Sequence, residues 1–171
     1  MTAALPKYSY DDFKLWEGDW ELIEGHPVAM APSPVGKHQK LMLNIGYLLK
    51  EVLDEEDCEC EAYPELDWII DNSNILRPDL AVYCEDVEEY PKTTPKIVVE
   101  IISPSTAKND EELKYGIYER EGVAYYVLAY PDLGKVRIFA LHDDRYKKVY
   151  EGDGRFRFDL CDIEIDFGKV F

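Results

Sequence analysis

The sequence predicts an α/β fold: a mixed central β-sheet flanked by helices, with a C-terminal antiparallel meander. Between residues 37 and 53, apolar side chains recur every three or four positions, which is the spacing of an amphipathic helix. The runs 96–102 and 123–130 are rich in β-branched and aromatic residues, as in strands covered on both faces. A second helical segment separates these two runs, and such alternation is typical of α/β domains.

The N-terminal part is predicted to contain a short helix and a hairpin before the first long helix. Ser9 and Asp12 fit a capping box that opens the short helix. Residues 20–30 predict a β-hairpin with Glu24-Gly25 at its turn. The loop 31–36, rich in proline, leads into the long helix.

The middle of the chain predicts further strands of the sheet. Two or three strands are expected between residues 58 and 83, and the polar segment 71–74 is the clearest turn among them. The strand 96–102 should end at Ser103-Pro104, because proline cannot donate a hydrogen bond to a sheet.

The last part predicts a helix, a buried strand and the meander. Asp110 and Glu111 suit the first turn of a helix, where the helix dipole favours acids, and Gly122 suits its C-terminal end. The strand 123–130 follows. Turns of the meander are expected at 133–134, 142–144 and 152–154.

The composition is that of a globular protein. With 171 residues, of which 46% are hydrophobic, the chain suits one domain over residues 1–171. Its formal net charge of −17 argues against a broad nucleic-acid-binding surface, which is usually basic, although a local basic cleft or bound metal ions would remain compatible. The sequence shows neither a stretch able to span a bilayer nor the features of a secretory signal, so we expect a cytoplasmic protein.

The four cysteines are expected to be reduced thiols, as in other cytoplasmic proteins. Cys58 and Cys60 are close in sequence, whereas Cys84 and Cys161 are remote. A zinc site is the alternative, but no spacing of cysteine and histidine here matches a common structural zinc pattern.

Glu100 is the residue that points most directly to function. It lies inside an apolar, β-branched run, where a carboxylate is costly unless it is paired, protonated or bound to a metal ion. Asp79 is a second acid at the opening of a predicted strand. Two such carboxylates can hold a hard divalent cation such as Mg²⁺ or Mn²⁺, with the backbone carbonyl of Ile101 as a further ligand. The alternatives are a structural ion pair of Glu100 with Arg77 or Lys114, and a turn role for Asp79.

Three more residues are candidates for the same site. Lys114 lies four residues after Asp110 on a predicted helix, so it either reaches Glu100 to orient water or pairs locally with Asp110. Glu21 is either a third carboxylate of the site or an exposed hairpin acid. His38, at the start of the long helix, is a candidate for contact with phosphate, or else a surface histidine.

The ordered motifs of the chain resemble those of the Uma-two (Uma2) family, which is described as putative restriction endonucleases and is common in cyanobacteria and other bacteria. The resemblance spans about residues 8–167. Its motifs are Trp20-Glu-Leu-Ile-Glu-Gly25, Met30-Ala-Pro-Ser33, His38-Gln39, Arg77-Pro-Asp79, Val98-Val-Glu-Ile-Ile-Ser-Pro-Ser-Thr106, Asp110, Lys114, Tyr118, Gly122-Val123 and Tyr125-Tyr126-Val127.

The resemblance implies a restriction-endonuclease-like core with the motif Asp, then Asp/Glu-x-Lys. It assigns metal binding to Asp79 and Glu100 and a supporting role to Glu21. The position two after Glu100 is Ile102 rather than lysine. The resemblance implies that Lys114, on the following helix, replaces that lysine.

The leading hypothesis is therefore a Mg²⁺- or Mn²⁺-dependent endonuclease that hydrolyses phosphodiester bonds of nucleic acid, with DNA as the expected substrate. Asp79, Glu100, Lys114 and Glu21 would be catalytic, His38 and Lys108 would bind substrate, and a homodimer is the expected assembly. The alternatives are an inactive binding module with the same fold and a metal-dependent hydrolase of small phosphoesters.

Overall fold

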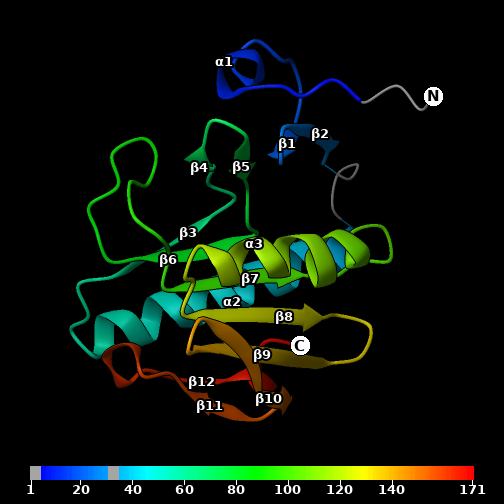
Figure 1. Cartoon of the computed structure of the whole chain (residues 1–171). Coiled ribbons are helices and arrows are strands. Elements are labelled where there is room, and N and C mark those ends of the chain that lie inside the picture. The colour runs from blue at the N-terminus through cyan, green and yellow to red at the C-terminus, as the bar shows by residue number, and fades with distance from the viewer. Residues whose placement is uncertain (1–4, 31–34) are drawn as a thin grey trace.

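The computed structural model describes residues 5–30 and 35–171 (Figure 1). The expected loop 31–36 therefore lies mostly outside the described residues. The predicted capping box is present: Ser9 caps α1 (Tyr10–Phe13), and its backbone N–H and hydroxyl both donate to the Asp12 carboxylate. No helix in the described ranges is long and apolar enough to cross a membrane.

A six-stranded mixed sheet forms the centre of the molecule, as predicted. Its two central strands, β7 (Ile97–Ile101) and β8 (Tyr125–Tyr130), are parallel, and every other pairing in it is antiparallel. In the order β10-β9-β8-β7-β6-β3, the remaining strands are β10 (Arg145–Gly152), β9 (Lys135–His142), β6 (Leu80–Tyr83) and β3 (Glu61–Pro64).

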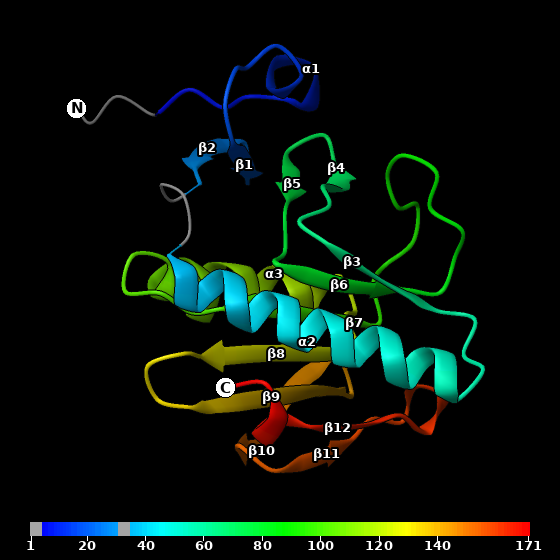
Figure 2. The same cartoon turned by 180° about the vertical axis from the view of Figure 1, so that it is seen from behind.

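Helices cover both faces of this sheet, so its central strands are buried (Figures 1 and 2). The predicted long helix is α2 (Gly36–Glu55), whose buried leucines and isoleucine pack on one face. The shorter α3 (Tyr115–Arg120) packs on the other face through Ile117 and Tyr118. Because side chains alternate along a strand, Ile97, Val99 and Ile101 of β7 join the core on the α2 side, and Glu100 faces the α3 side.

A separate four-stranded antiparallel sheet lies beside the central one. Its order is β2-β1-β5-β4, and it contains the predicted hairpin of β1 (Trp20–Ile23) and β2 (His26–Ala29). It also contains β4 (Trp68–Asp71) and β5 (Asn74–Leu76), joined by the predicted turn. Between residues 58 and 83 the chain thus forms four strands rather than two or three, because β4 and β5 are too short for sequence patterns to separate.

The C-terminal meander is only partly confirmed. β8, β9 and β10 are consecutive antiparallel neighbours, but β11 (Arg155–Arg157) and β12 (Glu164–Asp166) form a two-stranded sheet of their own. The 3-10 turn η2 (Leu160–Asp162) connects these two strands, and η3 (Phe167–Lys169) follows. Apolar side chains of this segment, including Phe158 and Ile165, pack into the core on the α2 side.

The helix predicted after Ser103-Pro104 has an irregular first half. Residues Asn109–Lys114 form a π-helical segment, η1, which runs directly into α3. Gly122 follows α3 with a φ of +79°, as expected for a glycine at a helix C-terminus. π-Helical segments are rare in proteins, and those that occur often lie at functional sites. This one carries Asp110 and Lys114.

The prediction of four reduced thiols is wrong for this structure. Cys58 is disulfide-bonded to Cys161, and Cys60 is bonded to Cys84. The two bonds link positions 103 and 24 residues apart, so sequence spacing gave no sign of the pairing.

Candidate active site at the end of β7

A cavity of about 610 Å³ lies where the four-stranded sheet, the end of β7 and η1 meet. It brings together residues from segments that are far apart in the sequence. Its lining includes six of the residues singled out from the sequence, Glu21, His38, Asp79, Glu100, Asp110 and Lys114. Lys108, by contrast, is exposed and does not line the cavity.

Lys114 is at the centre of the buried charges in this cavity. Its Nζ lies 2.9 Å from Glu21 Oε1, 3.0 Å from Glu100 Oε1 and 3.5 Å from Asp110 Oδ1. The lysine side chain is only 6% exposed, so these acids replace the water that would otherwise solvate its charge. Lys114 therefore both reaches Glu100 and pairs with Asp110, which the sequence had left as alternatives.

Glu100 is buried and bonded to groups from the following helix. Its Oε1 accepts hydrogen bonds from Lys114 Nζ and from the Tyr118 hydroxyl, at 3.0 and 2.8 Å. Burial raises the pKa of Glu100 well above its ordinary value, the charge of Lys114 opposes this effect, and the neighbouring acids reinforce it. Burial also raises the pKa of Tyr118, so its hydroxyl remains a donor at neutral pH.

The lysine stays charged although it is buried. Burial alone would lower the pKa of Lys114, but Glu100, Glu21 and Asp110 together hold it well above its ordinary value. The three acids therefore share one positive charge. Burial also raises the pKa of Asp110, so this carboxyl binds a proton more readily than an exposed one does.

Glu21 comes from β1 and is 4% exposed, so the interpretation as an exposed hairpin acid is wrong. Besides the contact with Lys114, its Oε1 accepts a hydrogen bond from the backbone N–H of Arg77 at 2.8 Å. The Arg77 side chain pairs with Asp67 and Asp19. The structural partner of Glu100 is therefore Lys114 and not Arg77.

Asp79 lies directly before β6, at the strand opening that the sequence predicted. Its Oδ2 accepts a hydrogen bond from the backbone N–H of Ile101 at 2.6 Å, which fixes the carboxylate beside the end of β7. His38, in the first turn of α2, places Nε2 3.2 Å from the same oxygen. The hydrogen bond to Asp79 raises the pKa of His38, which favours the protonated imidazole.

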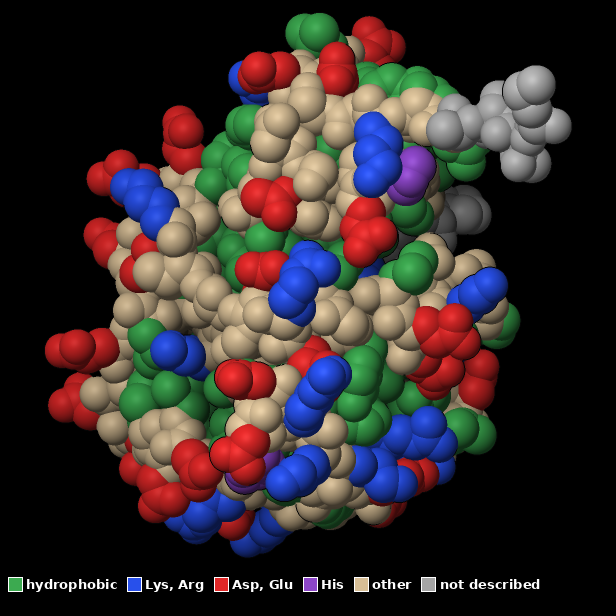
Figure 3. Space-filling view, in the orientation of Figure 1, with side chains coloured by type: hydrophobic (Ala, Val, Ile, Leu, Met, Phe, Trp, Pro, Cys, Tyr) green, Lys and Arg blue, Asp and Glu red, His purple; other side chains and the backbone are tan. Residues whose placement is uncertain are grey.

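Acidic groups outnumber basic groups in the lining of the cavity. Six acids line it, Asp19, Glu21, Glu65, Asp79, Glu100 and Asp110, against two permanently basic groups, Arg77 and Lys114. Elsewhere, on the face shown in Figure 3, acidic and basic side chains are interspersed, and no broad basic surface is visible. The local charge therefore favours a bound cation over an anionic ligand alone.

Two carboxylate oxygens remain available to such a cation. The hydrogen bonds to Glu100 end on Oε1 and those to Asp79 end on Oδ2, so in the described part of the chain Glu100 Oε2 and Asp79 Oδ1 accept none. Within the same ranges, no three carboxylates or histidines hold ligand atoms within 4.8 Å of one another. Mg²⁺ is usually held by one or two carboxylates and keeps several waters, so Asp79 and Glu100 are the residues that could hold it.

Asp110 and Tyr118 are the members of this cluster that the sequence did not assign to the site. Tyr118 binds Glu100, and the backbone carbonyl of Asp110 accepts a hydrogen bond from Tyr126. The available signal was the spacing of four residues between Asp110, Lys114 and Tyr118, which places all three on one side of a helix.

Comparison with known proteins decides the family. The model of the Uma2 family, described as "Putative restriction endonuclease", matches residues 10–156. The chain belongs to the Uma2 family. This confirms the resemblance drawn from the ordered motifs, which include Asp79, Glu100 and Lys114.

Relatives of this Uma2 chain occur in the cyanobacterium Synechocystis sp. (strain ATCC 27184 / PCC 6803 / Kazusa). One is "Uncharacterized protein slr1290", 25% identical over 97% of this chain and 91% of the relative. Another is "Uncharacterized protein sll1609", 26% identical over 57% of this chain and 58% of the relative.

A solved structure confirms the fold. A "putative nuclease belonging to DUF820" from Anabaena variabilis ATCC 29413 is similar with a TM-score of 0.78 and 18% identity, over 95% of this chain and 97% of that one. At this identity the likeness establishes the predicted mixed α/β fold.

Proposed function

We propose that this protein is a Mg²⁺- or Mn²⁺-dependent endonuclease that hydrolyses phosphodiester bonds of DNA. The observation that carries the proposal is that one cavity holds two carboxylates with available oxygens and a charged lysine. Asp79 lies directly before β6, Glu100 lies in β7, and the lysine is Lys114. Membership of a family described as "Putative restriction endonuclease" supports it.

Asp79 and Glu100 are the residues that would hold the metal ion, with the backbone carbonyl of Ile101 as an expected third protein ligand. A bound divalent cation supplies a Lewis acid that polarises the phosphate and lowers the pKa of water. The hydrogen bond from Ile101 N–H holds Asp79 in position before any ion binds. The acid-rich lining also provides the charge that attracts a cation.

Ile102 occupies the position of the motif lysine and carries no charge. Lys114 would supply that positive charge instead. Lys114 lies in the π-helical segment η1, which follows β7, and its ammonium lies 3.0 Å from Glu100 Oε1. A charged group there orients a water molecule for attack and stabilises the negative charge that develops on the phosphate. Three acids fix the position of this ammonium, so it needs no reorganisation during the reaction.

The remaining candidates have supporting roles. Glu21 holds Lys114, and we assign it the positioning of that lysine. His38 lines the cavity and donates to Asp79 when protonated; contact with phosphate would require it to exchange this partner. Lys108 is exposed at the edge of η1, where it would meet a polymer backbone rather than the reacting phosphate. A homodimer would present two such sites to the two strands of a duplex.

Cleavage of supercoiled plasmid and of single-stranded DNA tests the proposal. Wild type should cut with Mg²⁺ or Mn²⁺ and lose activity in EDTA, and Glu100→Gln should reduce the rate by at least about 100-fold, as loss of a metal ligand does. The matched control is Glu112→Gln, because Glu112 is exposed on η1 and outside the cavity lining. Equal cutting by wild type and Glu100→Gln would refute the assignment.

The buried Glu100–Lys114 pair gives a specific reason to keep the inactive binding module as the second candidate, because such a pair is also compatible with a structural role. Absence of cutting with both metals and both substrates, from a chain that is folded, would favour that module. Cleavage of a small phosphodiester with little dependence on salt, but not of DNA, would favour the hydrolase of small phosphoesters, since binding to a polymer releases counterions.

A further inference from the structure

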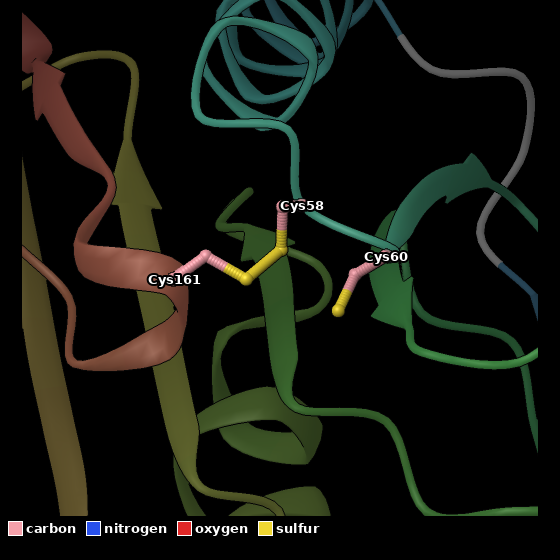
Figure 4. A group of neighbouring side chains, drawn as sticks. All are labelled: Cys58, Cys60 and Cys161. Carbon is pink, nitrogen blue, oxygen red and sulfur yellow. A yellow bond between two sulfur atoms is a disulfide. The ribbon is translucent and has the colours of Figure 1, made fainter.

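The four cysteines meet at one place in the fold, away from the carboxylate cavity. The sulfur atoms of Cys58, Cys60 and Cys161 lie within 4.8 Å of one another (Figure 4). Cys84 is bonded to Cys60. This is the one group in the described ranges whose sulfur, nitrogen or carboxylate ligand atoms cluster so closely. Two disulfides would cross-link the chain equally well if they lay far apart. A metal site, by contrast, requires its ligands to lie close together, as these cysteines do.

We propose that in the reduced chain these four cysteines bind one Zn²⁺ ion as a structural site with four thiolate ligands. Zinc bound to four thiolates at about 2.3 Å places the sulfurs about 3.8 Å apart in a tetrahedron. The three clustered sulfurs already lie within 4.8 Å of one another, and reduction of the two S–S bonds frees the bonded sulfurs to separate to this spacing. Cys84, next to Cys60, supplies the fourth ligand.

The sequence around the cysteines is acidic. Each cysteine is followed directly by an acid: Glu59, Glu61, Glu85 and Asp162 come after Cys58, Cys60, Cys84 and Cys161. Glu61 pairs with Lys50 and Asp162 pairs with Arg157, so these acids have partners of their own, and the charge that a divalent ion would offset is that of the four thiolates. Soft thiolate ligands select zinc over Mg²⁺ or Mn²⁺, so this site is chemically distinct from the carboxylate site.

The position of the cluster explains what the ion would stabilise. Cys58 and Cys60 lie between α2 and β3, Cys84 follows β6 directly, and Cys161 lies in η2 of the C-terminal segment. A zinc ion there would join the edge of the central sheet to the C-terminal segment. That segment also packs on the core through the buried side chains Phe158, Ile163, Ile165, Phe167 and Val170, and through hydrogen bonds from Asn44 to the Val170 carbonyl and from the Asp159 N–H to Tyr125. Binding free energy of such an ion adds to folding free energy.

The conversion between the two forms is balanced with a dithiol as the reductant. Two dithiol molecules become cyclic disulfides and give four electrons and four protons to the two S–S bonds of the chain, which become four S–H groups. Zinc then forms four Zn–S bonds and displaces the four protons.

The test is the zinc content of the 171-residue chain after reduction with a phosphine, loading with zinc and desalting. A phosphine is used because, unlike a dithiol, it does not compete for zinc through thiolates; two phosphines and two waters become two phosphine oxides and supply the same four electrons and four protons. We expect about one zinc ion per chain for wild type and less than about a tenth of that for Cys58→Ser and Cys161→Ser. The control is Asp79→Asn with Glu100→Gln, which removes the carboxylate site and should leave the zinc content unchanged. Wild type loaded with Co²⁺ should show sulfur-to-cobalt charge-transfer absorption, a readout that does not depend on how well the variants fold.

Two outcomes would overturn the proposal. One is a reduced, folded wild type that retains no zinc, shows no such absorption with Co²⁺ and titrates four free thiols. The other is a zinc content that is the same in wild type and in the cysteine variants, which would place the ion elsewhere.

Discussion

Replacement of Lys114 by methionine should destabilise the protein strongly. Methionine keeps most of the side-chain volume but removes the ammonium that lies 2.9, 3.0 and 3.5 Å from three buried carboxylates. Removing one partner of a buried ion pair typically costs about 3–5 kcal/mol, because the other charge stays buried without compensation. Water cannot compensate here, since Glu21, Glu100 and Asp110 are only 4%, 3% and 3% exposed. We therefore expect a loss near the upper end of that range.

Urea unfolding followed by circular dichroism measures this loss. The loss should shrink between about pH 7.5 and pH 5, because carboxyl groups that bind protons no longer need the lysine. The control Lys40→Met removes an exposed lysine of α2 and should change the free energy of unfolding by about 0.5 kcal/mol or less. A loss below about 1 kcal/mol at the higher pH, or one that does not shrink on acidification, would refute the electrostatic argument.

Three further predictions concern the neighbours of Lys114. Burial raises the pKa of Glu100, so the folded chain binds more protons than the unfolded chain, and the free energy of unfolding falls as pH rises through that raised pKa. Glu100→Gln should flatten this dependence of the free energy of unfolding on pH, measured by urea unfolding. An unchanged dependence would contradict the prediction. Tyr118→Phe removes one hydrogen bond to Glu100 and should cost about 1.5–3 kcal/mol in the same assay, whereas a cost below about 0.5 kcal/mol would mean that the bond is not formed. Asp79→Asn removes the partner that raises the pKa of His38, so an NMR titration should show that pKa moving down towards its ordinary value; no movement would contradict the contact.

Much of the fold follows from local sequence patterns. The capping box at Ser9, the hairpin turn at Glu24-Gly25 and the long helix α2 are all set by residues near one another in the chain. The buried strands β7 and β8 were recognisable because both their faces are apolar. The separation of β11 and β12 into their own sheet could not be predicted, because it depends on packing against α2 rather than on their own residues.

The sequence singled out several residues that line the candidate cavity, but not their geometry, and their roles stay predictions. The spacing of Asp110, Lys114 and Tyr118 showed that they share a helical face, but not that Lys114 would also meet Glu21. That contact depends on how the four-stranded sheet sits against the central one, and no local pattern encodes it. The meeting of Cys58 with Cys161 is a long-range contact of the same kind.

The most direct test of the metal site is titration of the protein with Mn²⁺, followed by electron paramagnetic resonance of the free ion. We predict that wild type and Glu112→Gln bind one Mn²⁺ ion with the same affinity. Glu100→Gln should weaken that binding by at least about tenfold, because it removes one of only two carboxylate ligands. Equal binding by wild type and Glu100→Gln would contradict the account and leave the buried cluster around Lys114 as a structural feature of the fold.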